Sequence, residues 1–211
     1  TISTVLLTGE TGVGKDLLAR LIHTLSPRRA GPFVPVLCSG LPDTLLESEL
    51  FGHEKGAFTG ADRRRAGRLA EAGGGTVFLD EVGTFSAPAQ VKLLRVLQDK
   101  VFRPVGGDRD QALDARIVAA TNLDLRALVE AGAFRADLFY RLNIFPIELP
   151  PLRRRPEDIP FLAMEALHGL NVLHRKAVAR IAPEVLRAFD RYGWPGNVRA
   201  QIGRATCRES V

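Results

Sequence analysis

The sequence is poor in the features that mark membrane, secreted and metal-scaffold proteins. It has only 2 cysteines in 211 residues, and Cys38 and Cys207 lie far apart without C-x-x-C spacing, so neither a disulfide framework nor a zinc site is indicated. No apolar run approaches the about 20 residues that a membrane helix needs, and the N-terminus lacks a basic-then-apolar signal pattern. These absences favour a soluble protein of the reducing cytoplasm, with no membrane contact.

Aromatic residues are also few, and the positive charge is not concentrated. Aromatics make up 7% of the chain, and the net charge of +5 comes from scattered arginines. The charge therefore does not choose between nucleic-acid contact and the arginines of phosphate sites or subunit interfaces. The four histidines have no paired metal-ligand spacing, so we assign no metal ligand among His23, His53, His168 and His174.

The chain does contain enough apolar residues, 45% of the total, to bury a globular core. In its first two-thirds, short apolar runs alternate with helix-period segments, which predicts an α/β fold with a mainly parallel sheet flanked by helices. The expected strands are Val5–Thr8, Phe33–Leu37, Thr76–Asp80, Arg116–Thr121 and Ile144–Leu149.

Two helices are expected to pack on this sheet through apolar stripes. The stripe of the helix over residues 15–25 consists of Leu17, Leu18, Leu21, Ile22 and Leu25. A second helix is expected to start near Ser86, with Pro88 in its first turn, and to carry Val91, Leu94 and Leu97 inward.

Prolines punctuate the chain around Pro150, where the strand-like runs stop. We therefore expect an α/β subdomain over residues 1–150 and a small all-α subdomain over residues 151–211. The helices expected in the second subdomain span Ile159–Leu173, Pro183–Arg191 and a segment from Pro195 onward.

A G-x-x-x-x-G-K segment lies between the first expected strand and the first expected helix. In that position it predicts a phosphate loop, whose backbone N–H groups and Lys15 bind nucleotide phosphates. The expected ATP-binding residues are Gly9, Glu10, Thr11, Gly12, Val13, Gly14, Lys15 and Asp16. Asp16 stands where a serine or threonine would contact magnesium, so it either binds Mg²⁺ through water or turns away from the phosphates.

Polar residues follow two of the expected strands. Asp80 and Glu81 end one of them, and with Lys15 they predict an ATPase site in which Asp80 holds Mg²⁺, through water, and Glu81 is the general base. Asn122 follows another strand and can sense the γ phosphate. The alternatives are ordinary solvated turns after each strand.

One short segment of the sequence is typical of a single protein family. Residues 56–61 read GAFTGA and resemble the loop of that name in sigma-54-dependent transcription activators, the NtrC-type bacterial enhancer-binding proteins. The resemblance continues through residues 134–142, 149–153 and 194–199. It implies an AAA+ P-loop ATPase, with residues 151–211 as the helical lid, that hydrolyses ATP with Mg²⁺ and moves this loop to remodel sigma-54 RNA polymerase for promoter opening. The residues implied to contact sigma-54 are Gly56, Ala57, Phe58, Thr59, Gly60 and Ala61.

The composition of the GAFTGA loop also favours a mobile segment that makes a contact. Small residues around one exposed phenylalanine predict a mobile tip with a single apolar anchor. The alternative is a tight turn whose phenylalanine belongs to the core. Residues 103–107 resemble the second projecting loop of the family, although a plain surface hairpin explains them as well.

By the same resemblance, Arg135 and Arg141 are arginine fingers that act across the subunit interface, and Arg199 is the cis arginine of the lid. Fingers acting in trans imply a homo-oligomeric ring, a hexamer or heptamer. The resemblance also implies regions beyond this sequence: upstream residues that enclose adenine, a receiver-type regulatory domain, and a C-terminal domain that alone would bind DNA. The residues after Arg199 depart from the family, as at a truncated or altered end.

Leu37 is another departure, because the family generally has an asparagine there whose amide pairs with the strand-end glutamate. We expect Leu37 to be buried at the end of its strand near Glu81, where a leucine cannot form a hydrogen bond. The alternative function is therefore a nucleotide-binding, assembly-competent interaction module with little hydrolysis. A general AAA+ remodeler such as a helicase or clamp loader leaves the GAFTGA loop unexplained.

Overall fold

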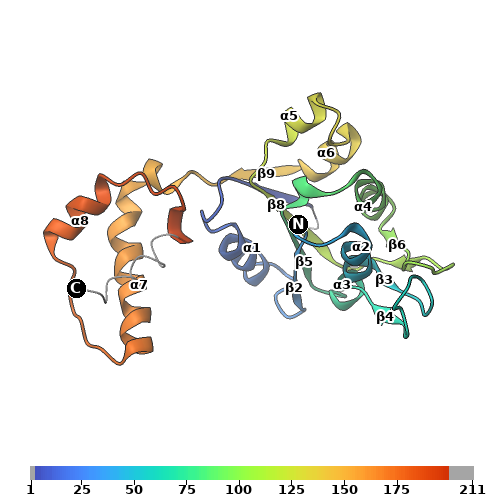
Figure 1. Cartoon of the computed structure of the whole chain (residues 1–211), viewed down its shortest axis with the longest axis horizontal. Coiled ribbons are helices and arrows are strands. Elements are labelled where there is room, and N and C mark those ends of the chain that lie inside the picture. The colour runs from blue at the N-terminus through green and yellow to red at the C-terminus, as the bar shows by residue number, and fades with distance from the viewer. Residues whose placement is uncertain (1–2, 200–211) are drawn as a thin grey trace. The chain divides into compact units, whose positions relative to one another are not determined.

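The computed structural model describes residues 3–199 and divides them into two compact units (Figure 1). The first unit contains residues 3–8 and 16–147, and the second contains residues 9–15 and 148–199. Cys207 and the divergent stretch after Arg199 lie outside the described residues. None of the helices in the described chain combines the length and apolarity needed to cross a bilayer.

A five-stranded sheet forms the centre of the first unit, in the order β2-β5-β8-β1-β9. Its strands are β1 (Val5–Thr8), β2 (Phe33–Leu37), β5 (Thr76–Asp80), β8 (Arg116–Thr121) and β9 (Phe145–Glu148). The pairs β2–β5, β5–β8 and β8–β1 are parallel, which confirms the expected fold class. The central strand β8 is buried along its whole length because both faces of a parallel sheet are covered.

Helices pack on this sheet and on one another. They are α1 (Lys15–Thr24), α2 (Asp43–Phe51), α3 (Arg68–Glu71), the 3-10 helix η1 (Val82–Thr84), α4 (Ala87–Asp99), α5 (Leu125–Glu130) and α6 (Ala136–Leu142). Helix α4 lies beside α6, and α2 lies beside α3. Leu50, Leu79, Leu93 and Leu138 join these elements in one hydrophobic core.

The prediction of which side of each of the two expected helices faces the core was partly wrong. Helix α1 packs through Ala19 and His23, which are buried, while Leu17, Leu21 and Leu25 are exposed. Those leucines lie four residues apart, so they share one side of the helix, and the small Ala19 lets the opposite side approach the sheet.

In α4 the buried side consists of Ala89, Gln90, Leu93, Val96 and Leu97. Val91 is half exposed, contrary to expectation, because it lies about 100° around the helix from Gln90.

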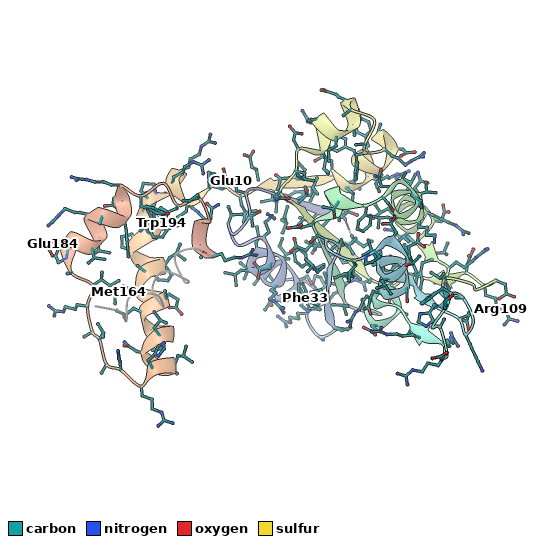
Figure 2. The ribbon with its side chains drawn as sticks, viewed as in Figure 1. Glu10, Phe33, Arg109, Met164, Glu184 and Trp194 are labelled. Atoms are coloured by element: carbon teal, nitrogen blue, oxygen red, sulfur yellow. The ribbon has the colours of Figure 1, made fainter. Side chains whose placement is uncertain are left out.

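Two short hairpins extend from the first unit; their strands were not among the expected strands, although a surface hairpin was one interpretation of residues 103–107. One pairs β3 (Gly52–His53) with β4 (Arg65–Ala66), and the other pairs β6 (Val101–Phe102) with β7 (Gln111–Ala112). Arg109, labelled in Figure 2, lies in the loop between β6 and β7.

The second unit is built from helices. After the 3-10 helices η2 (Leu152–Arg154) and η3 (Pro156–Asp158) come α7 (Ile159–His174) and α8 (Pro183–Asp190), close to the expected ranges. Trp194 is the centre of their small core: its ring meets Phe189 and Tyr192 edge to face, and its Nε1 donates to the Phe189 carbonyl at 2.9 Å (Figure 2).

Candidate functional site

The polar residues that follow the strands of the first unit meet at one edge of the sheet. In the parallel register Leu37 lies opposite Asp80, and Thr8 lies opposite Thr121. The carboxyl ends of β2, β5, β8 and β1 therefore share this edge, which is where ligands bind in α/β sheets. Asp80, Glu81 and the exposed Asn122 all lie there, within the first unit.

Glu81 has a backbone conformation that is rare for its residue type. Its φ of 63° and ψ of 44° are left-handed, and its carbonyl accepts hydrogen bonds from the backbone N–H (3.1 Å) and hydroxyl (2.8 Å) of Thr84. A glutamate in this region costs free energy, of order 1–3 kcal/mol, and such residues cluster at functional sites. The turn into η1 thus holds Glu81 at the strand end.

Cys38 lies next to this edge, and its thiol is inert. Its backbone N–H donates to the Asp80 carbonyl at 3.0 Å, and its side chain is buried. Burial, followed by the negative charges of Asp80 and Glu81, raises the pKa of the Cys38 thiol far above its usual range. The thiol therefore stays protonated beside the two acids.

The expected burial of Leu37 was wrong, because its side chain is 59% exposed. Along β2 the side chains alternate: Val34 and Val36 enter the core, while Pro35 and Leu37 lie on the other face. Strand β2 is at the edge of the sheet, and that face lines an open hollow of about 200 Å³. Asp16 and Asp80 line the same hollow, so Leu37 does lie near the acidic end of β5.

The expected phosphate loop, residues 9–15, belongs to the second unit. The Lys15 ammonium donates to the carbonyls of Gly9 and Glu10, at 2.8 and 3.1 Å. Gly9, Gly12 and Gly14 all have positive φ, which glycine adopts without strain. Arg199 lies against this loop as well, since its backbone N–H donates to the Gly12 carbonyl at 3.4 Å.

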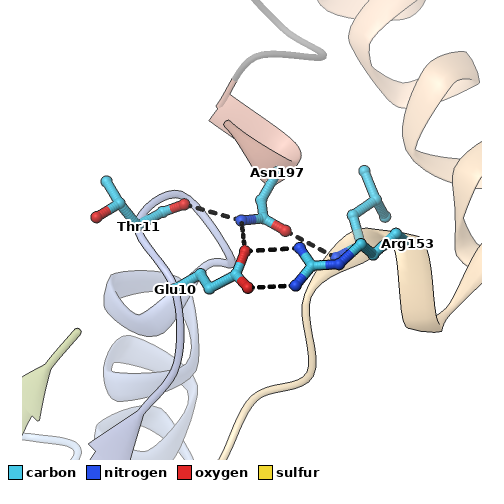
Figure 3. Close-up of polar contacts among 5 residues, drawn as sticks. Glu10, Thr11, Arg153 and Asn197 are labelled. Carbon is cyan, nitrogen blue, oxygen red and sulfur yellow. Dashed lines mark hydrogen bonds and ion pairs between the residues drawn. The ribbon is translucent and has the colours of Figure 1, made fainter. Parts of the chain in front are cut away.

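Figure 3 shows polar contacts of this loop that sequence reasoning missed. The Glu10 carboxylate accepts two hydrogen bonds from the Arg153 guanidinium, at 2.9 and 2.5 Å, and one from the Asn197 amide at 3.2 Å. Both partners lie in segments that the family resemblance covers, yet nothing in their spacing along the chain connects them with Glu10. The loop and both of these partners belong to the second unit.

The GAFTGA loop, residues 56–61, connects β3 to β4 and closes on itself. The Gly56 N–H donates to the Ala61 carbonyl at 2.8 Å, and the Ala61 N–H donates to the Phe58 carbonyl at 3.0 Å. Thr59 and Gly60 are exposed, but Phe58 is half-buried, so the expectation of an exposed aromatic tip was partly wrong. Its ring meets the His53 ring edge to face at a centroid distance of 5.0 Å.

His53 is therefore the support of Phe58. It is buried, and its Nδ1 shares a hydrogen bond of 2.7 Å with the Ser48 hydroxyl of α2. Its backbone also bridges to Val105 of the second hairpin, whose N–H donates to Gly52 at 2.8 Å and whose carbonyl accepts from Glu54 at 3.0 Å. The two hairpins are thus one structural element.

Arg135 and Arg141 both belong to the α6 region and are exposed. Arg135 precedes the helix and binds Asp137 of its own chain through two hydrogen bonds, at 3.0 and 2.7 Å, which raise the pKa of its guanidinium. Gln90 fixes this position: it is buried in α4, accepts the Arg135 backbone N–H at 2.9 Å, and donates to the Phe85 and Ala133 carbonyls. Sequence patterning placed Val91 inward and overlooked Gln90 beside it.

Comparison with known proteins agrees with this architecture. Residues 1–148 match the family model of the sigma-54 interaction domain, and residues 153–200 match that of the AAA+ ATPase lid domain. The Nif-specific regulatory protein of Herbaspirillum seropedicae is 54% identical over 93% of this chain and 36% of its own length. The transcriptional regulatory protein ZraR of Escherichia coli is 52% identical over 93% of this chain and 45% of its own. The chain therefore spans less than half the length of these relatives.

The chain is also similar to solved structures. The NtrX structure from Brucella abortus in complex with ADP has a TM-score of 0.89 and 37% identity, over 96% of this chain and 44% of that one. NtrX in complex with ATP has the same TM-score and identity over 98% and 46%. Hsp104, at 17% identity and a TM-score of 0.70, shares the AAA+ fold alone. The match of the sigma-54 interaction domain to most of the chain shows that it belongs to the AAA+ domain family of sigma-54-dependent transcription activators.

Proposed function

We propose that this chain is the ATP-hydrolysing core of such an activator, and that it uses ATP-driven movement of the GAFTGA loop to remodel sigma-54 RNA polymerase. The observation that carries the proposal is a GAFTGA loop held on a hairpin of the same unit that bears Asp80 and the strained Glu81. The NtrX structures with ADP and ATP support nucleotide binding. We assign this binding to Gly9–Lys15, with Arg199 as a further contact.

In the proposed reaction each residue has a separate task. Lys15 and the loop N–H groups bind the phosphates, Glu81 accepts a proton from the attacking water, and Asn122 senses the γ phosphate. Arg135 and Arg141 stabilise charge on the phosphoryl group bound by a neighbouring copy, so the active form is a homo-oligomeric ring.

The residues at the sheet edge fit a magnesium ion. In ATPase sites Mg²⁺ is held by one or two carboxylates together with substrate phosphates, and the residues Asp80 and Asp16 line one hollow. When bound, the ion neutralises charge on the phosphates. Within the described residues no three His, Cys, Asp or Glu side chains gather as ligands, so the phosphates would complete the site.

ATP turnover tests this proposal directly. We expect turnover per subunit to rise with protein concentration, because Arg135 and Arg141 would complete the site of a neighbouring copy, and to respond to added sigma-54. Binding of ATP and assembly without turnover would instead support the nucleotide-binding interaction module. The exposed Leu37, which offers Glu81 no amide, favours that second candidate.

We expect Thr59→Ala to separate hydrolysis from remodelling. Thr59 is exposed on a loop that belongs to the β3–β4 hairpin, so ATP turnover should stay within about twofold, while sigma-54 remodelling falls about tenfold or more, as at a contact hot spot. Both are measured on the same preparation. Thr44→Ala, at an exposed threonine of α2, is the matched control and should change neither. An equal loss of turnover and remodelling in Thr59→Ala would contradict the loop assignment.

For Leu37→Asn we expect a small stability change and a larger regulatory one. Because the side chain is 59% exposed, the free energy of unfolding should change by no more than about 0.5 kcal/mol. The new amide would lie at the register position opposite Asp80, one residue before Glu81. The ratio of ATP turnover with sigma-54 to turnover without it should therefore increase. An unchanged ratio in a folded, assembled variant would mean that this position does not control the base.

A further inference from the structure

The phosphate loop is tied to the residues after β9 through the side chain of Glu10. Arg153 approaches the carboxylate side-on, with Nη1 at 2.9 Å from Oε2 and Nη2 at 2.5 Å from Oε1 (Figure 3). This two-bond geometry matches the planar guanidinium to the planar carboxylate and fixes the orientation of both. It joins η2 to the second residue of the loop.

Asn197 completes the contact from a third segment of the second unit. Its side chain is fully buried; Nδ2 donates to Glu10 Oε2 at 3.2 Å and to the Thr11 carbonyl at 3.0 Å, while Oδ1 accepts the Leu152 N–H at 2.8 Å. A buried amide with both ends satisfied is specific to one arrangement of its neighbours. Glu10, η2 and the turn at Asn197 therefore adopt one mutual geometry.

The backbone of the loop is held in the same way. The Gly12 carbonyl accepts the Val198 N–H at 3.0 Å, and the Val13 carbonyl accepts Nη2 of Arg155 at 2.8 Å. A Cβ atom on Gly12 would come within 2.4 Å of the Gly196 carbonyl, so the turn lies directly against the loop.

These contacts orient the N–H groups that a phosphate needs. In a trans peptide the C=O of one residue and the N–H of the next point in opposite directions. Because the carbonyls of residues 11, 12 and 13 point toward Asn197, Val198 and Arg155, the N–H groups of residues 12, 13 and 14 point away from these residues. Successive N–H groups that face one way form the concave site in which a phosphate binds.

We propose that Glu10, Arg153 and Asn197 are positioning residues for nucleotide binding: they hold the phosphate loop in its phosphate-binding shape by joining it to the lid. This inference rests on the proposed function, since it assigns a role at the same nucleotide site. None of the three residues needs to touch the nucleotide. They act by keeping the loop N–H groups aligned before the phosphates arrive, which lowers the entropy lost on binding.

The Glu10 carboxylate that accepts these hydrogen bonds is ionised near neutral pH. The hydrogen bonds from Arg153, followed by that from Asn197, lower the pKa of Glu10 to about 2. A lowered pKa means that the pair stabilises the folded state above the ordinary value of 4.5 and loses this effect as the pH falls toward 2. A change in nucleotide affinity between pH 6 and 8 would therefore come from another group.

The test compares Arg153→Gln with Arg154→Gln in the 211-residue chain. Both variants remove one exposed arginine of η2, but of these two arginines it is Arg153 that donates hydrogen bonds to Glu10. The dissociation constants of ADP and of ATP are measured by calorimetry, the latter with a slowly hydrolysed analogue. We expect Arg153→Gln to raise both about three- to tenfold, Arg154→Gln to leave both unchanged, and Arg153→Lys, which keeps the charge but not the two-bond geometry, to fall between them.

Steady-state measurement of KM and kcat distinguishes a positioning role of Arg153 from a catalytic role. For Arg153→Gln we expect KM to rise with the dissociation constants, while kcat at saturating ATP stays within about twofold, because bound nucleotide restores the loop shape. A weaker affinity for the ATP analogue with unchanged ADP affinity would overturn the proposal, since Arg153 would then contact the γ phosphate itself. Unchanged affinity for both nucleotides in the folded variant would also overturn it.

Different experimental results would contradict the positioning role of Arg153 and the proposed function. Nucleotide binding that is undetectable in the unaltered chain, or that survives Lys15→Ala, would contradict the proposed function. Binding that requires Lys15 but is indifferent to Arg153 would contradict the positioning role alone. Because Arg153 is exposed, its substitution does not disturb a core, and the matched Arg154→Gln variant reports any general effect on the lid.

Discussion

Lys15→Ala should abolish nucleotide binding, whereas Glu81→Gln should keep the affinity for ATP within about twofold and reduce turnover by roughly 10²–10⁴. The physical reason is that Lys15 meets the phosphates in the ground state, while Glu81 acts on water only as the reaction proceeds. ATP binding is measured by calorimetry and turnover by phosphate release, on both variants and the unaltered chain.

The control for this pair is Glu54→Gln, which removes a carboxylate at the base of the GAFTGA loop rather than at the sheet edge. Glu54 pairs with Arg64 at 3.2 Å on the partly exposed surface of the hairpin, so its loss should leave ATP binding unchanged. Equal loss of ATP binding in Lys15→Ala and Glu81→Gln would refute the division of tasks between them. Full turnover in Glu81→Gln would exclude this residue as the base.

Arg135→Ala and Arg141→Ala should each reduce turnover in the assembled state, by up to about 10³, the lower range for an arginine finger. The ion pair with Asp137 holds Arg135 within its own chain in the described structure, so a finger role requires the guanidinium to leave Asp137 when a neighbour binds ATP. That pair is exposed, so water can replace its hydrogen bonds when the guanidinium leaves.

Mixed assemblies decide whether the arginines act across an interface. An Arg135→Ala subunit keeps Glu81, and a Glu81→Gln subunit keeps both arginines, so a mixture contains some sites with a base and a finger. We expect the mixture to be more active than either variant alone. Activity no higher than that of the separate variants, with mixed assembly verified by size, would favour a cis or structural role for the arginines.

The sequence alone determined where the strands of the sheet lie in the chain and which chemical groups follow them. The five sheet strands follow from runs such as Thr76–Asp80, whose continuous apolar character is typical of a strand buried on both faces. The acids at its end, and the G-x-x-x-x-G-K segment after β1, are local patterns that need no knowledge of distant contacts. The GAFTGA segment likewise indicates the family by itself, because its six residues are contiguous in the chain.

Only the tertiary structure decided which side of an element is buried and which distant residues meet. Leu37 and the leucines at 17, 21 and 25 are apolar yet exposed, because burial depends on what covers a face and not on the residue that occupies it. Gln90 and His53 are polar yet buried, because partners far along the chain or across a turn satisfy their hydrogen bonds. The contact of Glu10 with Arg153 and Asn197 joins residues more than a hundred positions apart, and a pairing at that separation has no local pattern that could reveal it.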